Sequence, residues 1–194
     1  MRRKKTILAA LLAAVLAVLT ACGPRIYEPA GEPTGVESLD AAVLTLLQEL
    51  CDPKAGLEEN LGIVYDWVRD EIAYRAGAED TSGGFTDELT AALAEAMLSK
   101  RRGNCDGEAA LMAVLLRRMG CESVVVQGTF TREDGQEVDH AWVIARVGEV
   151  CRHFDPLYER YYTENADRSC FLGTDADFLT THSWQQADYP ACAE

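Results

Sequence analysis

The stretch Gly103-Asn104-Cys105-Asp106-Gly107-Glu108-Ala109 decides the fold, because it marks where a helix begins. Small and apolar residues recur from there at helical spacing, and Gly120 follows them, so the pattern predicts a helix from Cys105 to Met119. Cys105 is then the first residue of that helix. The N-terminus of a helix carries a partial positive charge and free N–H groups, which favour a thiolate over a thiol. The sequence therefore predicts a candidate nucleophile at a helix start.

Downstream of this helix the pattern changes to that of β-strands. Three runs rich in β-formers follow one another: residues 124–130, 141–147 and 150–155. Asp134-Gly135 is a hairpin turn between the first two runs, Gly148 turns the chain again, and Pro156 ends the third run. These strands are expected to form an antiparallel meander.

Two polar residues on these strands complete a possible thiol triad with Cys105. His140 stands on the second strand, where a rigid sheet can aim its ring at the helix start. Asp155 ends the third strand, where a carboxylate can orient the imidazole and stabilise its charged form. Sequence spacing by itself leaves open whether the three side chains meet.

Upstream of Cys105 the chain is helical. Apolar residues recur at intervals of three to four in three further segments: residues 36–50, 57–72 and 87–100. Residues 75–86, which are rich in Gly, Asp and Ser, read as a loop. Helices grouped before an antiparallel meander predict an α+β fold, with N-terminal helices packed on an antiparallel β-sheet, rather than a doubly wound α/β fold.

Four motifs in this order resemble the core of the bacterial transglutaminase-like superfamily. They are 103–109, Leu116-Arg117-Arg118-Met119-Gly120, His140-Ala141-Trp142-Val143 and Phe154-Asp155-Pro156. With the lead-in segments 64–68 and 72–74, the resemblance extends over about residues 57–157. It implies a papain-like α+β fold in which Cys105 is the nucleophile, His140 the general base and Asp155 the residue that orients it.

The same resemblance implies an activity on amides. Members transfer acyl groups from glutamine side-chain amides, or hydrolyse amide bonds when water is the acceptor, so the expected substrate is a protein or peptide. Two positions depart from the family pattern: Glu108 stands where many members have an aromatic residue, and Cys151 where many have tryptophan. These departures keep a second hypothesis open, a catalytically inactive domain that binds peptides or partner proteins.

Three further residues are candidates for the site. The hydroxyl of Tyr74 is a possible second donor to the oxyanion, beside the backbone N–H of Cys105. Trp142 and Trp184 are expected to line the pocket, the latter from a C-terminal extension that starts near residue 158. His153 and His182 have no assigned role. No C-x-x-C or H-x-x-x-H spacing supports a metal site, so neither a metal nor a cofactor is expected.

The first residues have the pattern of a targeting signal. A basic stretch (residues 2–5) precedes an uncharged apolar run (residues 7–19) that is too short to span a bilayer, which is typical of a signal peptide over residues 1–21. Leu19-Thr20-Ala21-Cys22 resembles the bacterial lipobox, which implies a lipidated Cys22 carrying fatty acyl chains such as palmitate. Residues 22–35 read as a Pro/Gly tether. A single domain over 36–194 is then expected on the extracytoplasmic face of the bacterial cell membrane.

Charge and cysteine content narrow the possible functions. The chain of 194 residues has a formal net charge of −14, which argues against a nucleic-acid partner, because nucleic-acid-binding proteins cluster Lys and Arg on one face.

Apart from Cys22 and Cys105, five cysteines have an open pairing state: Cys51, Cys121, Cys151, Cys170 and Cys192. If one disulfide forms, Cys170 with Cys192 is the favoured pair, because both lie in the tail.

Overall fold

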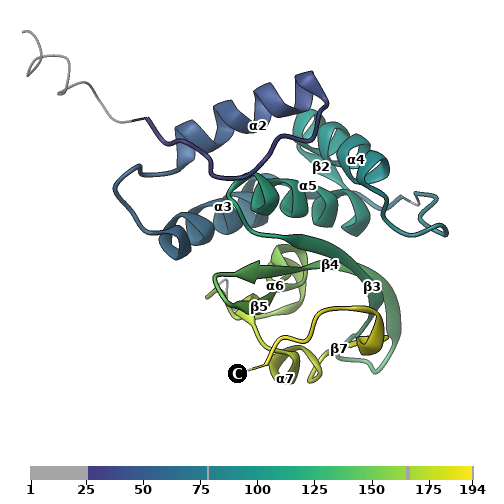
Figure 1. The fold of residues 1–194 in the computed structure, drawn as a ribbon. Coiled ribbons are helices and arrows are strands. Elements are labelled where there is room, and N and C mark those ends of the chain that lie inside the picture. Colours follow the sequence, from purple (N-terminus) through teal and green to yellow (C-terminus); the bar gives the residue numbers. More distant parts are fainter. Residues whose placement is uncertain (1–25, 78, 165–166, 194) are drawn as a thin grey trace, which may run out of the picture.

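Four long helices gather on one side of a five-stranded antiparallel sheet, and the C-terminal segment folds over the other side (Figure 1). The computed structural model describes residues 26–77, 79–164 and 167–193. The predicted signal peptide and Cys22 lie outside the described residues. Among the helices in these ranges, none combines the length and the apolar content that crossing a membrane requires. The predicted α+β class is confirmed.

The predicted helices form close to the expected bounds. They are α2 (Glu37–Leu50), α3 (Leu57–Glu71), α4 (Asp87–Lys100) and α5 (Cys105–Arg118). Gly120 follows α5 with a φ of 93°, a conformation that a residue without a side chain adopts at low cost. The structure adds two short helices after the sheet, α6 (Pro156–Tyr162) and α7 (Asp175–Phe178), and a 3₁₀ turn over Gln186–Asp188.

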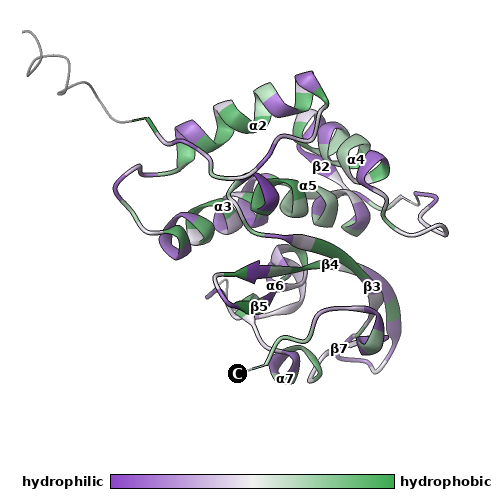
Figure 2. Ribbon diagram, viewed as in Figure 1, coloured by the Kyte–Doolittle hydropathy of each residue, from purple (hydrophilic) through white to green (hydrophobic). Residues whose placement is uncertain are grey.

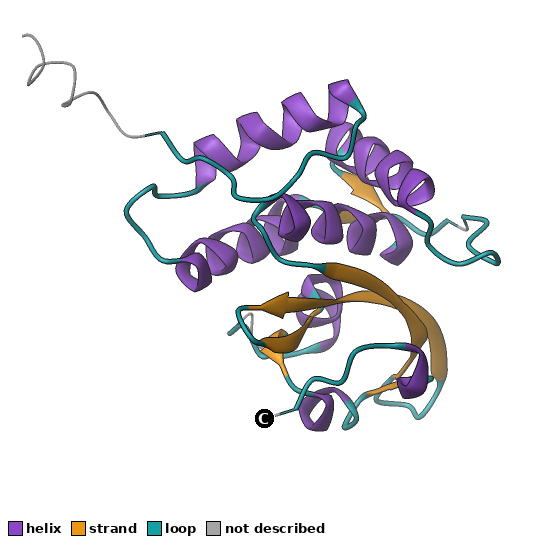
Figure 3. Ribbon diagram, in the orientation of Figure 1, coloured by secondary structure: helices purple, strands orange, loops and turns teal. Residues whose placement is uncertain are grey.

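The sheet has the strand order β6-β5-β4-β3-β7. Its centre is the predicted meander: β3 (Ser123–Thr131), β4 (Glu137–Val147) and β5 (Val150–Phe154). Two edge strands of three residues each, β6 (Phe171–Gly173) and β7 (His182–Trp184), come from the C-terminal extension. A separate parallel pair joins β1 (Ala73–Tyr74) to β2 (Arg102–Gly103), immediately before α5. Figure 3 shows the helical layer on one side of the five-stranded sheet, with a short strand of the separate pair among the helices.

Alternate residues of β4 enter two different hydrophobic cores. Ala141, Val143 and Ala145 pack in the larger core with the helices, whereas Trp142 and Ile144 pack in a smaller core with the C-terminal extension. Much of α5 and β4 is coloured as hydrophobic in Figure 2, as expected for elements that lie between the two layers. Because side chains alternate along a strand, His140 lies on the same face as Trp142, the face that the extension covers.

The predicted tether also contacts the helical layer. Tyr27 packs against the larger core, and the backbone N–H of Gly31 donates to the carbonyl of Arg118 (3.0 Å). A Cβ on Gly31 would lie 1.8 Å from the carbonyl oxygen of Arg117, so only glycine permits this close approach. The segment from Tyr27 onward therefore packs on the domain whose start is expected near Val36.

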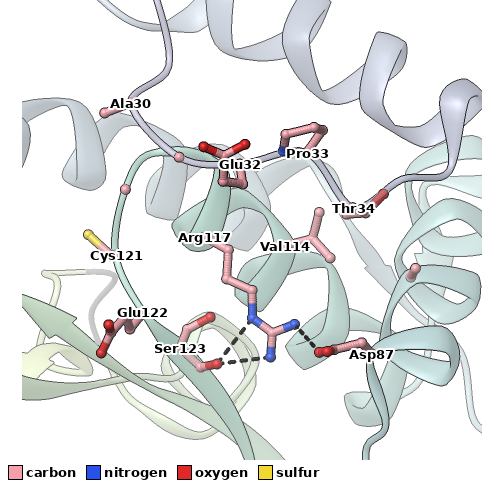
Figure 4. A pocket seen from close by; sticks show the side chains of 13 residues that line it. Ala30, Glu32, Pro33, Thr34, Asp87, Val114, Arg117, Cys121, Glu122 and Ser123 are labelled. Carbon is pink, nitrogen blue, oxygen red and sulfur yellow. Dashed lines mark hydrogen bonds and ion pairs between the residues drawn. The ribbon is translucent and has the colours of Figure 1, made fainter.

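A hollow of about 610 Å³ lies beside this segment (Figure 4). Residues 30–34 form one wall, and residues of α4, α5 and the start of β3 form the others. The guanidinium of Arg117 spans the hollow, where it donates to the Ser123 carbonyl (2.9 and 3.1 Å) and pairs with Asp87 (3.0 Å). None of its lining residues lines the cavity at Cys105. The cation in this hollow thus has partners within the chain.

Gly128 on β3 controls how closely β7 approaches the sheet. A Cβ on Gly128 would lie 2.3 Å from the Ser183 carbonyl oxygen and 2.8 Å from the Trp142 ring. We expect Gly128→Ala to lower the free energy of unfolding by about 1–3 kcal/mol, because the added methyl group overpacks this contact. Urea unfolding followed by circular dichroism measures the change.

Gly56→Ala is the matched control, because a Cβ on Gly56 meets no atom within 4 Å and its φ is −71°. Its free energy of unfolding should stay within about 0.5 kcal/mol of the native value. Equal effects of the two substitutions would show that β7 does not depend on the close approach at Gly128.

Candidate active site

Cys105 lies at the N-terminus of α5, as the sequence predicts. The side chain of Asn104 caps the helix by accepting a hydrogen bond from the Gly107 N–H (3.1 Å). The parallel pair of β1 with β2 fixes the chain just before this cap. Cys105 is partly exposed, whereas the other cysteines among the described residues are buried. The thiol is therefore held at the positive end of a helix and open to a substrate.

The sheet brings His140 and Asp155 together. β4 and β5 pair antiparallel, with Val143 opposite Phe154, so Asp155 emerges beside the strand that carries His140. The two side chains are almost fully buried, and His140 Nε2 lies 2.7 Å from Asp155 Oδ2. A carboxylate oxygen accepts, so Nε2 carries the hydrogen.

The Cys105 thiol lies beside the His140 ring: the two residues line one cavity, and the thiol is one of the groups that raise the pKa of His140. Because Nε2 is held by Asp155, Nδ1 is the nitrogen left for the sulfur. Burial opposes the charged ring, but the Asp155 carboxylate, its hydrogen bond with the ring and the neighbouring Cys105 thiol outweigh it and raise the pKa of His140 to about 10. The three residues predicted to form the triad therefore meet, in the order thiol, imidazole, carboxylate.

Asp155 stays ionised inside the protein because several donors point at it. Burial acts to raise its pKa, but His140 and His182 hold the pKa of this carboxyl well below its usual range. The backbone N–H of Tyr158 donates to Oδ1 (2.9 Å), so Asp155 also caps α6. The Tyr65 hydroxyl, whose one hydrogen is shared between Glu159 and the Asp155 carbonyl oxygen, lies 3.1 Å from that carbonyl oxygen.

A second buried carboxylate, Glu159, holds the surroundings of Asp155 in place. Arg69 of α3 pairs with Oε1 of Glu159 (2.7 Å), while the Tyr65 hydroxyl (2.9 Å) and the Cys170 N–H (3.0 Å) donate to Oε2. The Asp155 N–H in turn donates to the Cys170 carbonyl (3.0 Å). The helical layer and the C-terminal extension therefore both form hydrogen bonds with the short segment that carries Asp155 and Glu159.

His182 is a functional candidate that sequence reasoning missed. It lies on β7, and its Nε2 is 3.0 Å from Asp155 Oδ2, the oxygen that His140 also contacts. Its Nδ1 lies 2.8 Å from the Thr181 hydroxyl. A single histidine in a three-residue strand carries no periodic signal, and only the pairing of β7 with β3 brings it to Asp155.

Tyr74 lies where the sequence predicts. Tyr74, Cys105 and His140 line one cavity of about 220 Å³, whose other lining residues include Arg132, Tyr161 and Tyr162. Burial and then the charge of the Cys105 thiolate raise the pKa of Tyr74, so its hydroxyl keeps its hydrogen at neutral pH. The position is suitable for a donor to an oxyanion formed at Cys105.

The two tryptophans lie elsewhere than expected. Trp142 and Trp184 pack against each other in the smaller core, edge to face, with ring centroids 5.6 Å apart. Neither of them lines the cavity at Cys105. Trp142 instead stacks behind the His140 ring (6.0 Å), because the two residues share one face of β4. The structure therefore places both tryptophans outside this cavity, where Trp142 supports the His140 ring and Trp184 packs on Trp142.

Among the described residues, two groups have donor atoms spaced closely enough for a metal ion: His140, Asp155 and His182, and His153, Asp175 and Cys192. Existing hydrogen bonds occupy the second group. The indole N–H of Trp142 donates to His153 Nδ1 (2.9 Å), which leaves the proton on Nε2, where it bonds Asp175 (2.8 Å). A metal there would have to displace that proton from Nε2. The group fastens the C-terminal segment to β5.

The six cysteines from Cys51 onward are free thiols. The favoured disulfide between Cys170 and Cys192 is therefore absent. The reason is that each residue is anchored at a different place: Cys170 bonds Asp155 and Glu159, whereas the Cys192 N–H donates to Asp175 (2.9 Å). Burial raises the pKa of Cys192 to about 12 and that of Cys51 to about 11, so these thiols stay protonated.

Glu108, one turn after Cys105, is a buried carboxyl group beside the triad. Its Oε1 has no hydrogen-bond partner within the described part of the chain. Burial, and then the negative charge of Asp155, raise its pKa well above the usual range. Protonation of Glu108 keeps a second negative charge away from Asp155.

This protonation gives a pH-dependent stability. The native state of Glu108 holds its proton more tightly than the unfolded chain, so stability is full below pH about 4.5 and falls as the pH rises towards the folded pKa. The slope is at most about 1.4 kcal/mol per pH unit. We expect Glu108→Gln, which is neutral at every pH, to gain stability relative to the native protein between pH 5 and pH 8 in urea unfolding.

Glu149→Gln, at the exposed turn between β4 and β5, is the control. Its free energy of unfolding should differ from that of the native protein by the same amount at pH 5 and at pH 8. If the difference between Glu108→Gln and the native protein were also the same at the two pH values, the Glu108 carboxyl would be charged in the native state at neutral pH, which would contradict the expectation.

Comparisons with known proteins give one family match and several distant structures. A family model described as "Transglutaminase-like superfamily" matches residues 45–156, which is more than half of the chain. A search of curated proteins gave no match. Among solved structures, a candidate cysteine protease from Cytophaga hutchinsonii shares 17% identity (TM-score 0.46), with coverage of 61% of this chain and 37% of that protein.

Two further structures are similar at the same level. A TGase shares 14% identity (TM-score 0.45; 66% of this chain, 32% of that one), and the periplasmic domain of TgpA from Pseudomonas aeruginosa shares 21% (TM-score 0.40; 66% and 45%). The chain thus spans less than half of each of these proteins. The family match over residues 45–156 shows that the chain belongs to the transglutaminase-like superfamily.

Proposed function

We propose that the protein is a membrane-anchored thiol enzyme that transfers or hydrolyses the acyl groups of protein or peptide amides. One observation carries the proposal: Cys105 at the start of α5 lines the same cavity as His140, whose ring contacts the buried Asp155 carboxylate through Nε2. Such an arrangement produces a thiolate beside an imidazolium, the pair that thiol acyl transfer requires.

The first step forms a thioester. The sulfur of Cys105 attacks the carbonyl carbon of the amide, and the thiol proton moves to Nδ1 of His140. Asp155 stabilises the charged ring through the 2.7 Å contact at Nε2. The C–N bond then breaks, and the proton on His140 passes to the leaving nitrogen, which departs as ammonia or an amine.

The oxyanion that forms during attack has two possible donors. The N–H of Cys105 lies in the first turn of α5, where backbone N–H groups have no partner within the helix. Tyr74 lines the cavity at Cys105 and could supply its hydroxyl as the second donor. In the second step His140 removes a proton from water or from an amine, and the new nucleophile releases the acyl group from Cys105.

The surface beside Cys105 supports a peptide rather than a small free amide as the acyl donor. The cavity at Cys105 holds only about 220 Å³, but Arg132, Tyr161 and Tyr162 also line a neighbouring hollow of about 680 Å³. Tyr161 and Tyr162 are both exposed there. A glutamine side chain can enter the small cavity while its peptide backbone lies along the tyrosines.

The test combines turnover with thiol labelling. We expect the mature protein to release ammonia from, or couple a fluorescent amine to, a glutamine-containing protein such as casein. Cys105→Ala, His140→Ala and Asp155→Ala should each lose this activity by about 10³-fold or more, since the three residues act as one unit. In the native protein, iodoacetamide should label Cys105 at neutral pH before any other thiol.

Cys121→Ala is the control, because Cys121 is buried in the larger core away from His140. It should keep both the turnover and the labelling of Cys105. Slow labelling of Cys105, together with no difference in turnover between the native protein and Cys105→Ala, would favour the alternative of an inactive peptide- or partner-binding domain.

The position in the cell follows from the N-terminal sequence. We propose that residues 1–21 are removed and that Cys22 carries the lipid that anchors the domain on the extracytoplasmic face of a bacterial membrane. In a bacterial host, Cys22→Ala should move the protein from the membrane fraction to the soluble fraction. Cys51→Ala should stay with the membranes. Retention of the Cys22 variant in washed membranes would exclude this anchor.

A further inference from the structure

The C-terminal extension contributes a side chain to the triad. The family match ends at residue 156, whereas His182 lies on β7, after the extension has passed β6 and α7. Its Nε2 lies 3.0 Å from the same oxygen of Asp155 that His140 contacts at 2.7 Å. The His182 side chain is 1% exposed, so no water competes for this contact from the solvent side.

The hydrogen on this contact can be assigned from its chemistry. A carboxylate oxygen only accepts, so His182 Nε2 carries a hydrogen and donates it to Asp155. The Thr181 hydroxyl bonds Nδ1 (2.8 Å) and fixes the ring orientation. With the Tyr158 N–H on Oδ1, the carboxylate accepts three hydrogen bonds, two of them on Oδ2.

We propose that His182 is a positioning residue of the triad, which holds Asp155 by a second hydrogen bond on Oδ2 and limits how strongly that oxygen binds the His140 imidazolium. The inference rests on the proposed function. The N–H of His182 brings the positive end of a dipole to the oxygen that stabilises His140. It therefore stabilises the Asp155 carboxylate and disfavours the charge on His140 at the same time.

This restraint has a use in the reaction. His140 must give its proton to the leaving nitrogen after the thiol has attacked. A buried carboxylate that bonded His140 alone would hold the imidazolium more tightly and oppose that transfer. With two donors on one oxygen, Asp155 stays in place, and its hydrogen bond to the charged His140 ring is weaker than it would be with His140 alone.

The fold holds His182 rigidly enough for this role. β7 pairs with β3, with His182 opposite Phe130, and Gly128 allows the two strands to approach closely. Aromatic rings surround the imidazole: Trp142 at 5.0 Å, Tyr158 at 4.6 Å and Phe178 at 4.7 Å between centroids. The ring is therefore packed on several sides as well as hydrogen-bonded at both nitrogens.

Other titratable groups also face His140 and Asp155, and they are unchanged in the residue-182 variants described below. Around His140 they lie on α5, on the segment with β1 and at the end of β5: Cys105, Asp106, Glu108, Tyr74 and Asp155. Around Asp155 they come from α3, α5 and the segment from β5 to β6: Tyr65, Glu108, His153 and Cys170. A change confined to residue 182 thus isolates its own hydrogen bond.

The chain has three histidines, so the titration of each ring can be followed by NMR of the Cε1–H groups in the mature protein between pH 6 and about 12. The matched variants are His182→Gln, whose amide N–H can replace Nε2, and His182→Met, which has a similar length and no donor. We expect the pKa of His140 to rise by about one pH unit in the Met variant. The Gln variant should stay close to the native value.

Equal His140 titrations in the Met and Gln variants, or a fall in the Met variant, would overturn the proposal, because loss of packing alone affects both variants alike. If the Met variant does not fold, Thr181→Val, which removes the hydroxyl on Nδ1, should produce a smaller rise. An unchanged titration in Thr181→Val would then overturn it. The NMR titration needs no substrate, so it tests the role of His182 independently of turnover. A native protein whose Cys105 is unreactive in the labelling and turnover tests would refute the proposed function without affecting the titration result.

Discussion

The structure of the site depends on a carboxylate that remains charged although it is buried. Asp155 lies where the sheet, the helical layer and the C-terminal extension meet, and each of them supplies a group that contacts it. His140 of β4, His182 of β7 and the Tyr158 N–H of α6 contact its carboxylate, while Tyr65 of α3 contacts its backbone carbonyl. Without the donors on the carboxylate the charge would be expelled or neutralised, because an unpaired buried carboxylate is costly. The packing of separate segments is therefore linked to the charge on one side chain.

This arrangement also explains why a small domain has so many buried polar groups near its centre. Glu159 is paired with Arg69 and Tyr65, His153 with Trp142 and Asp175, and His182 with Asp155 and Thr181. Each of these networks ties the extension after residue 156 to the part of the chain that matches the family. Glu108 differs from them because it avoids the cost of burial by protonation rather than by pairing.

Local patterns predicted most of the elements and part of the site. Helical spacing and the Gly-Asn pair before Cys105 predict α5 and place the thiol at its start, and β-rich runs with an Asp-Gly turn predict the central meander. Alternation along β4 also implies that His140 and Trp142 share a face. It does not tell which layer covers that face, so the tryptophan was expected in the pocket, whereas it packs behind the imidazole.

The sequence by itself determined the family and the α+β class and named the three candidate triad residues, because these follow from ordered motifs and from periodicities within single elements. Only the tertiary structure decided which distant groups complete the site. His182 comes 27 residues after Asp155 on a strand of three residues, and only the pairing of β7 with β3 brings it to that carboxylate. Contacts of this kind depend on strand order and edge pairing, which are set by the packing of the whole chain rather than by any local pattern.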